Sequence, residues 1–284
     1  MEFASDFNAL IAEQQLISKQ SSVSTQPPVE RAESSLGTST PTSIEQLLST
    51  SPEIYRASVR SICPATNPED WAAAQLALGA VLRAQSWRER GNTRLFMCRQ
   101  AAAAFEAAAS VYSSNLPVLK SASDDAGSSS NKDGIDLVLE ATQQPFLQGS
   151  EELEGALNLF KLDCSTHAQA ADVRQWLVSM INVGCALVLL GKIAAAAGDT
   201  SRLEEAIDTF RAVLSQSALY EFPNEYYATY INLSEAFRSL SEVAMGEESW
   251  RYMESCLSAL TKALLRVVPQ QYRSLIDHDP IVPA

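Results

Sequence analysis

One apolar pattern recurs along this chain at intervals of fifty residues. It reads Leu-x-x-Ala-Leu-x-x-Phe at residues 153–160, Leu-x-x-Ala-Ile-x-x-Phe at 203–210 and Met-x-x-Cys-Leu-x-x-Leu at 253–260. An earlier copy, Cys-x-x-Ala-Ala-x-x-Phe, occupies residues 98–105. The spacing is that of one helix face, and the small residue four positions before the large one lets a neighbouring helix approach closely. The pattern therefore predicts the second helices of four helical hairpins.

A second pattern predicts first helices that precede these. Trp71, Trp176 and Tyr226 each open an apolar helical stretch, and a small residue follows eight positions later (Gly79, Gly184 and Ser234). Glycine inside a helix costs about 1 kcal/mol relative to alanine, so close contact between the two helices of a hairpin is its expected reason. Alternating patterns typical of strands are not found. The predicted fold class is all-α.

These residues carry a resemblance to a known family. The segments WAAAQLALGAVL (71–82) and GDTSRLEEAIDTF (198–210) resemble tetratricopeptide repeats, in their long-repeat bacterial version. The resemblance covers residues 67–113 and about 150–268, and implies a stack of antiparallel hairpins, an α-solenoid, with a concave groove. Ser234 stands where the family has glycine, and Leu260 where it has an aromatic residue. No first helix of the second repeat is recognisable in 114–150.

The predicted organisation has three parts. Residues 1–42 form a mostly disordered arm, because 18–42 are rich in Ser, Thr, Pro and Gln and lack large apolar groups. Within the arm, residues 1–17 have an amphipathic pattern that fits either a frayed helix or a docking peptide. Residues 43–270 form the helical-repeat domain, with a flexible insertion at about 114–134 and a short helix at 135–142. Residues 271–284 form a C-terminal tail.

Composition narrows the classes of function. A net charge of −13 argues against a general nucleic-acid binder, which needs clustered Lys and Arg. No run of about 18 apolar residues is present, which predicts no membrane insertion. The N-terminus lacks the basic and apolar regions of a secretory signal. The five cysteines are scattered without a C-x-x-C pair, so we expect buried thiols, no metal, no cofactor and a cytoplasmic location.

Catalytic constellations are also not found, which predicts a protein that is not an enzyme. No nucleophile-elbow, phosphate-loop or zinc-protease motif occurs. The two histidines, His167 in an expected loop and His278 in the expected tail, are not placed beside a candidate nucleophile. Glu204, Glu205 and Asp208 lie where a helix begins, and acids are favoured there as a solvated start.

Charge is distributed unevenly along the chain. Residues 83–99 have a balance of +4, whereas residues 199–255 have a balance of −7. Two interpretations stay open. The charges are solvated helix faces, or they make a basic and an acidic end that orient a partner or favour head-to-tail self-association.

Candidate binding residues follow from the implied architecture, in which the first helices line the concave face. An Asn amide can bind a peptide backbone through its donor and its acceptor, and an Arg can fork onto a carboxylate. Two pairs occupy equivalent repeat positions: the asparagines lie fifty residues apart and the arginines 155 apart. The candidates are Gln75, Arg83, Asn182, Asn232, Glu235 and Arg238.

The expected function is therefore a non-enzymatic scaffold or adaptor that binds a protein segment in a helical-repeat groove. One alternative is a secretion chaperone or an exported effector, because the leader resembles, in composition alone, the leaders of such effectors. An alternative of another class is a ligand sensor or an enzyme that uses the groove as a pocket.

Overall fold

A computed structural model describes residues 49–113, 129–143 and 149–277. Within these residues the secondary structure is helical and no strand occurs, which confirms the all-α class. The predicted arm at 1–42 and residues 114–128 of the predicted insertion lie outside the described residues. The helices are α3 (Pro52–Ser61), α4 (Pro68–Ser86), α5 (Gly91–Ser113), α6 (Ser129–Gln143), α7 (Ser150–Ala170), α8 (Val173–Ala195), α9 (Ser201–Leu214), α10 (Pro223–Val243) and α11 (Gly246–Val267), with short 3₁₀ helices η1 (Ser217–Glu221) and η2 (Gln270–Leu275).

Proline marks where several helices begin. Pro52, Pro68 and Pro223 occupy the first positions of α3, α4 and α10, where a missing amide proton costs no hydrogen bond. The Ser51 hydroxyl accepts a hydrogen bond from the amide of Glu53 at 3.3 Å and so caps α3. Pro68 and Pro223 lie three residues before Trp71 and Tyr226, so α4 and α10 begin close to where the sequence predicted first helices.

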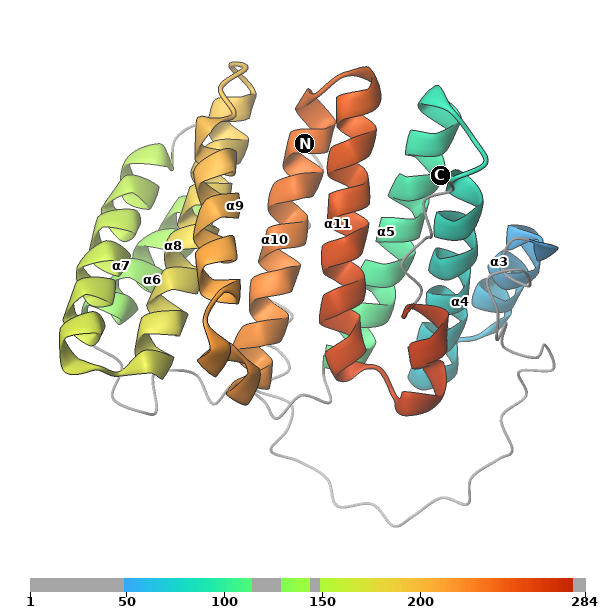
Figure 1. Cartoon of the computed structure of the whole chain (residues 1–284), viewed down its shortest axis with the longest axis horizontal. Helices are drawn as coiled ribbons and strands as arrows, with labels where there is room; N and C mark the ends of the chain where they lie inside the picture. Colours follow the sequence, from blue (N-terminus) through green and yellow to red (C-terminus); the bar gives the residue numbers. More distant parts are fainter. Residues whose placement is uncertain (1–48, 114–128, 144–148, 278–284) are drawn as a thin grey trace, which may run out of the picture.

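The helices form a row of hairpins that does not follow the order of the chain (Figure 1). The hairpins α6–α7, α8–α9 and α10–α11 pack in succession, and α10 contacts both helices of α8–α9. The N-terminal hairpin α4–α5 lies at the far end of this row, where α5 packs on α11 and α3 covers α4. The first hairpin in the sequence is therefore the neighbour of the last.

A glycine of the first helix contacts a phenylalanine ring of the second helix in the hairpins α4–α5 and α8–α9. A Cβ atom on Gly79 would lie 2.6 Å from the Cε1 atom of the Phe105 ring, and Gly184 faces Phe210 in the same way. Both rings are buried. The predicted close contact between the helices of a hairpin is confirmed, because only a residue without a side chain leaves room for the ring.

Helix α6 corrects the prediction of a flexible insertion for residues 129–134. These residues form the start of α6, and a Cβ atom on Gly134 would lie 2.6 Å from Cε1 of Phe160. Gly134 and Phe160 are 26 residues apart, as are Gly79 and Phe105, and Gly184 and Phe210. Helix α6 is thus the first helix of the second hairpin, and it starts before the short helix that the sequence predicted at 135–142.

Part of the predicted C-terminal tail is folded against the helices. Residues expected there form η2, which packs on α4 and buries Leu275 and Ile276. Burying two large aliphatic side chains anchors this segment. Residues 278–284, including His278, lie outside the described part of the chain.

Helix α8 is predominantly apolar, although Arg174, Asn182 and Lys192 interrupt its sequence. Of the described helices, it is the one long and apolar enough to cross a membrane by length and composition alone, with a mean hydropathy of 2.0 over its most apolar window. Counting uninterrupted apolar residues did not identify it. In the fold 56% of that window is buried, between α7 and α9 among others. Helices covered on more than one side are typically apolar all round, so burial in the row accounts for this composition.

The contact between the first and last hairpins joins charged and aromatic side chains. Arg83 of α4 forms an ion pair with Glu254 of α11 at 2.6 Å, and both side chains are largely buried. The rings of Trp87 and Trp250 meet edge to face at 5.4 Å, and the Arg94 guanidinium lies 4.5 Å from the Trp250 ring centroid. Segments that the sequence identified as basic and acidic therefore meet inside one chain.

Candidate functional site

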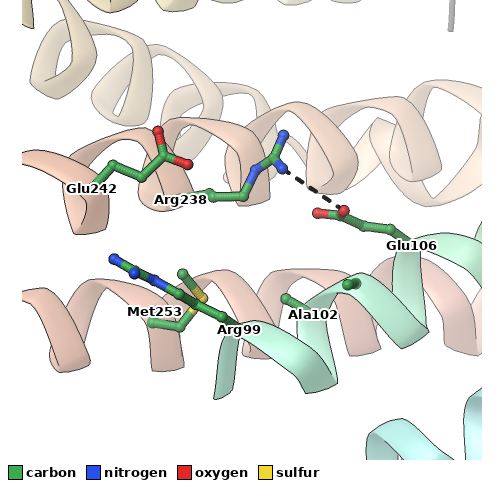
Figure 2. A pocket seen from close by; sticks show the side chains of 7 residues that line it. Arg99, Ala102, Glu106, Arg238, Glu242 and Met253 are labelled. Atoms are coloured by element: carbon green, nitrogen blue, oxygen red, sulfur yellow. Dashed lines mark ion pairs between the residues drawn. The ribbon is translucent and has the colours of Figure 1, made fainter. Parts of the chain in front are cut away.

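Two hollows lie on either side of α5. The charged hollow has a volume of about 160 Å³ and lies between α5, α10 and α11 (Figure 2). The second, which we call the α4 hollow, has a volume of about 260 Å³ and lies between α3, α4 and α5. Ala103 lines both, so the hollows adjoin across α5. The other residues of the charged hollow are Arg99, Ala102, Glu106, Arg238, Glu242 and Met253, and those of the α4 hollow are Arg56, Gln75, Leu78, Leu82, Gln100 and Ala104.

The sequence of α5 explains why the molecular surface is recessed between the two hollows. Residues 101–104 are four successive alanines, and three more follow at 107–109. Alanine is the best helix former and has the smallest side chain after glycine, so the helix is stable while its surface stays shallow. Larger side chains from α4 on one side and from α10 on the other then form the walls of the hollows.

Arg238 is the centre of the charges in the charged hollow. Its Nε donates a hydrogen bond to Glu235 at 2.8 Å, and its guanidinium lies 3.9 Å from the Glu106 carboxylate of α5. Lys192 of α8 forms an ion pair with Glu235 from the other side. Burial opposes ionisation of Glu235, but Lys192 and Arg238 outweigh it and hold the pKa of this carboxyl below its usual value.

Arg99 and Glu242 present opposite charges at the same end of the hollow (Figure 2). Within the described chain neither side chain forms an ion pair closer than 4 Å. Burial raises the pKa of Glu242 and, on the α5 side, that of Glu106, although nearby cations oppose the rise. A positive group from outside would therefore stabilise these carboxylates, and a negative group would pair with Arg99.

Two of the predicted binding residues come together here. Glu235 and Arg238 form part of the charged network, and Asn232 lies half-buried one turn earlier on α10. Gln75 lines the α4 hollow instead. The structure thus divides the predicted set between the two sides of α5.

Two other predicted residues have partners within the fold. Arg83 is only 6% exposed and pairs with Glu254, so a partner cannot reach its guanidinium. Its repeat equivalent Arg238 lies in the charged hollow instead. The environments of the two arginines differ because the hairpin of Arg83 packs on α11 and not on α6. The Asn182 amide donates a hydrogen bond at 2.8 Å to Asn131 of α6, and so joins two hairpins.

Sequence reasoning missed Lys192, Arg99, Glu106 and Glu242. Arg99 and Glu106 lie on α5, a second helix, and these helices were not expected to face a groove. Helix α5 reaches the face of α10 only because the first hairpin packs beside the last one. The repeat pattern contains no signal for that packing order.

A buried polar cluster between α7 and α8 does not have the geometry of a catalytic triad. His167 lies in α7 and not in the expected loop, and its Nε2 is 3.5 Å from the Asp163 carboxylate. The Ser179 hydroxyl donates to the other oxygen of Asp163. A triad requires the histidine between the serine and the acid, whereas here the acid lies between them and the hydroxyl is fully buried.

The cysteines differ in their environment. All five are free thiols, and Cys63 is exposed where burial was expected. Hydrogen bonds, first from the Thr66 side chain, lower the pKa of Cys63. Burial raises the pKa of Cys98 and Cys164 to about 11 and that of Cys185 to about 12. The Cys256 thiol is buried and its pKa is raised as well.

We expect one thiol per chain to react rapidly with a disulfide reagent at neutral pH. The reactive species is the thiolate, and Cys63 alone combines exposure with a lowered pKa. Absorbance of the released thiolate measures the stoichiometry, and a Cys63→Ser variant should lose the fast phase. A fast phase that survives in Cys63→Ser would show that one of the other cysteines is accessible.

Comparisons of the chain with family models, with curated proteins and with solved structures find no match.

Proposed function

We propose that this chain is a non-enzymatic, tetratricopeptide-like adaptor that binds an extended protein segment across α5. The observation that carries the proposal is the pair of adjoining hollows that share Ala103. A segment crossing α5 would place one side chain in each hollow. The glycine–phenylalanine pairs at a constant spacing support the tetratricopeptide-like part of the proposal.

The size of the hollows favours side chains over a free ligand. Small-molecule sites usually measure about 300–1,000 Å³. The hollows measure about 160 and 260 Å³, below this range. Their size therefore favours single side chains of a bound segment over a larger ligand or substrate.

The lining of the hollows defines the chemistry of the segment. Glu242 and Glu106 favour a basic side chain in the charged hollow, and Arg99 favours an acidic group beside it. Leu78 and Leu82 favour an apolar side chain in the α4 hollow, where Gln75 can bind the backbone of the segment. Glu235, Arg238 and Asn232 continue the polar surface on α10. The proposed location is the cytoplasm, because the thiols are free.

We expect peptides selected from a random display library on the wild-type protein to carry neighbouring basic, acidic and apolar residues. Their affinity should fall roughly five- to 150-fold for the double variant Arg99→Ala/Glu242→Ala, since a lost hydrogen bond to a charged group costs about 1–3 kcal/mol. Added salt should weaken binding by the wild type as well, because exposed charges are screened. Calorimetric titration of the selected peptides measures both effects.

The matched control is Asp208→Ala/Arg211→Ala, which removes an exposed ion pair of α9, away from both hollows. Its affinity should equal that of the wild type. Equal affinity in the Arg99/Glu242 variant, or an equal loss in the control, would show that the segment binds elsewhere.

A further inference from the structure

We propose that residues 52–113, which comprise α3, α4 and α5, form a docking unit that two copies of this chain can exchange. In a single copy this unit packs on α11 of its own chain. In the exchanged dimer it packs on α11 of the second copy, and the second copy's unit packs on the first. The inference concerns self-association and does not depend on the proposed segment.

The first observation is that the contacts of the unit lie with the C-terminal part of the chain. Helix α5 packs on α11, η2 packs on α4, and Glu106 of α5 reaches Arg238 of α10. Helix α6, which follows α5 in the sequence, lies at the other end of the row (Figure 1). Packing between the unit and its successor therefore does not decide which copy of α11 the unit occupies.

The second observation is that the chain between α5 and α6 is long enough to span the row. Sixteen peptide steps separate Ser113 from Ser129 and extend to about 55 Å at most. The packed pairs α5–α11, α11–α10, α10–α8, α8–α7 and α7–α6 link the two helices in five steps. At about 8–10 Å a step, the axes of α5 and α6 lie at most about 40–50 Å apart, which is within the reach of the connection. The connection thus allows closure in one chain, and the slack also allows it to cross to another.

The third observation is the charge complementarity of the surface. The ion pair between Arg83 and Glu254 is largely buried, and Cys98 lies beside it and is also buried. A like-charge pair at this position would oppose docking strongly. One residue on each side of the contact can therefore be reversed to control which unit fits which α11.

Exchange has a consequence for the candidate site. Arg99 and Glu106 come from the unit, whereas Arg238 and Glu242 come from α10. In the exchanged dimer each charged hollow contains residues of both copies. The second copy would therefore complete the site.

The test uses two full-length variants, Arg83→Glu and Glu254→Arg. Each alone has a like-charge pair in its own contact, so we expect an undocked unit and a reactive Cys98. After the two are unfolded together and refolded as an equimolar mixture, exchange matches both contacts. One contact becomes Glu with Arg, and the other is the native pair. We expect a one-to-one heterodimer in native mass spectrometry, twice the chain mass of 30.8 kDa, with Cys98 protected from thiol reagents.

The control is the double variant Arg83→Glu/Glu254→Arg, which matches the charges within one chain and should be a monomer with Cys98 protected. A mixture that stays as two monomeric species with reactive Cys98 would overturn the proposal. So would single variants that remain monomeric with Cys98 protected, because the contact would then not control docking.

A second variant tests exchange with the native contact intact. Deleting residues 117–126 leaves six peptide steps, about 20 Å at most, which is too short to span the row. We expect this variant to be a dimer by light scattering, while a variant with the same residues replaced by glycine and serine stays monomeric. A monomeric deletion variant with Cys98 protected would overturn the proposal, as would a dimer that persists after Glu254→Arg is added.

Discussion

Replacing Phe210 with alanine should lower the free energy of unfolding by about 3–5 kcal/mol. The side chain is fully buried, and its ring lies against Gly184 in the contact between α8 and α9. Removing the ring leaves a cavity that the rigid backbone of the two helices cannot close, and large-to-small changes at such sites have costs of this size. Denaturant titration with circular dichroism measures the change.

Phe96→Ala is the matched control, because it removes the same atoms from an exposed position on α5. The Phe96 side chain is 60% exposed, so its loss should change the stability by less than about 0.5 kcal/mol. A small effect at Phe210, or effects of similar size at both positions, would contradict the packing of α8 against α9.

Replacing Arg83 with alanine should also destabilise the fold strongly, by about 3–5 kcal/mol. The change removes one partner of a largely buried ion pair with Glu254, and breaking such a pair is costly. The loss should first release the first hairpin from α11, so the rate of thiol labelling at Cys98 should rise together with the loss of stability.

Two further variants identify the cause of this effect. Glu247→Ala removes an ion pair with Arg251 on the same helix α11, but both side chains are about 70% exposed. Exposed pairs contribute about 0–1 kcal/mol, so its effect should be small. Arg83→Met/Glu254→Met removes both charges and should be much less destabilising than Arg83→Ala. If the double variant is as unstable as the single one, packing and not charge explains the result.

The interior of each hairpin could be predicted from the sequence. The contact between Gly79 and Phe105, and that between Gly184 and Phe210, depend on residues 26 positions apart within one local unit. Helix periodicity and the steric limit set by glycine fix such contacts without knowledge of the rest of the fold. The sequence did not predict the first helix of the second hairpin, because α6 lacks the aromatic residue that opens the other first helices. Gly134 nevertheless keeps the spacing to Phe160.

The position of the first hairpin could not be predicted in this way. Repeat patterns specify which face of a hairpin is apolar, but not which neighbour covers it. Arg83 and Arg238 are equivalent in the repeat and yet lie in different environments, one buried against α11 and the other in the charged hollow. The charged hollow depends on the same long-range contact, so Arg99 and Glu106 could not be identified as site residues from spacing alone.

The contact between the first and last hairpins also affects how the chain folds. In most helical-repeat proteins each repeat contacts only its sequence neighbours, so folding can spread along the row and stability is nearly a sum over repeats. Here Trp87 meets Trp250 across more than 160 residues of sequence. During synthesis at about 5–20 residues per second, α11 would be completed about 8–30 s after α5. For that interval the α5 face that later packs on α11 has no cover from it. Folding of the two ends is therefore coupled, and the first hairpin made is among the last to reach its final place.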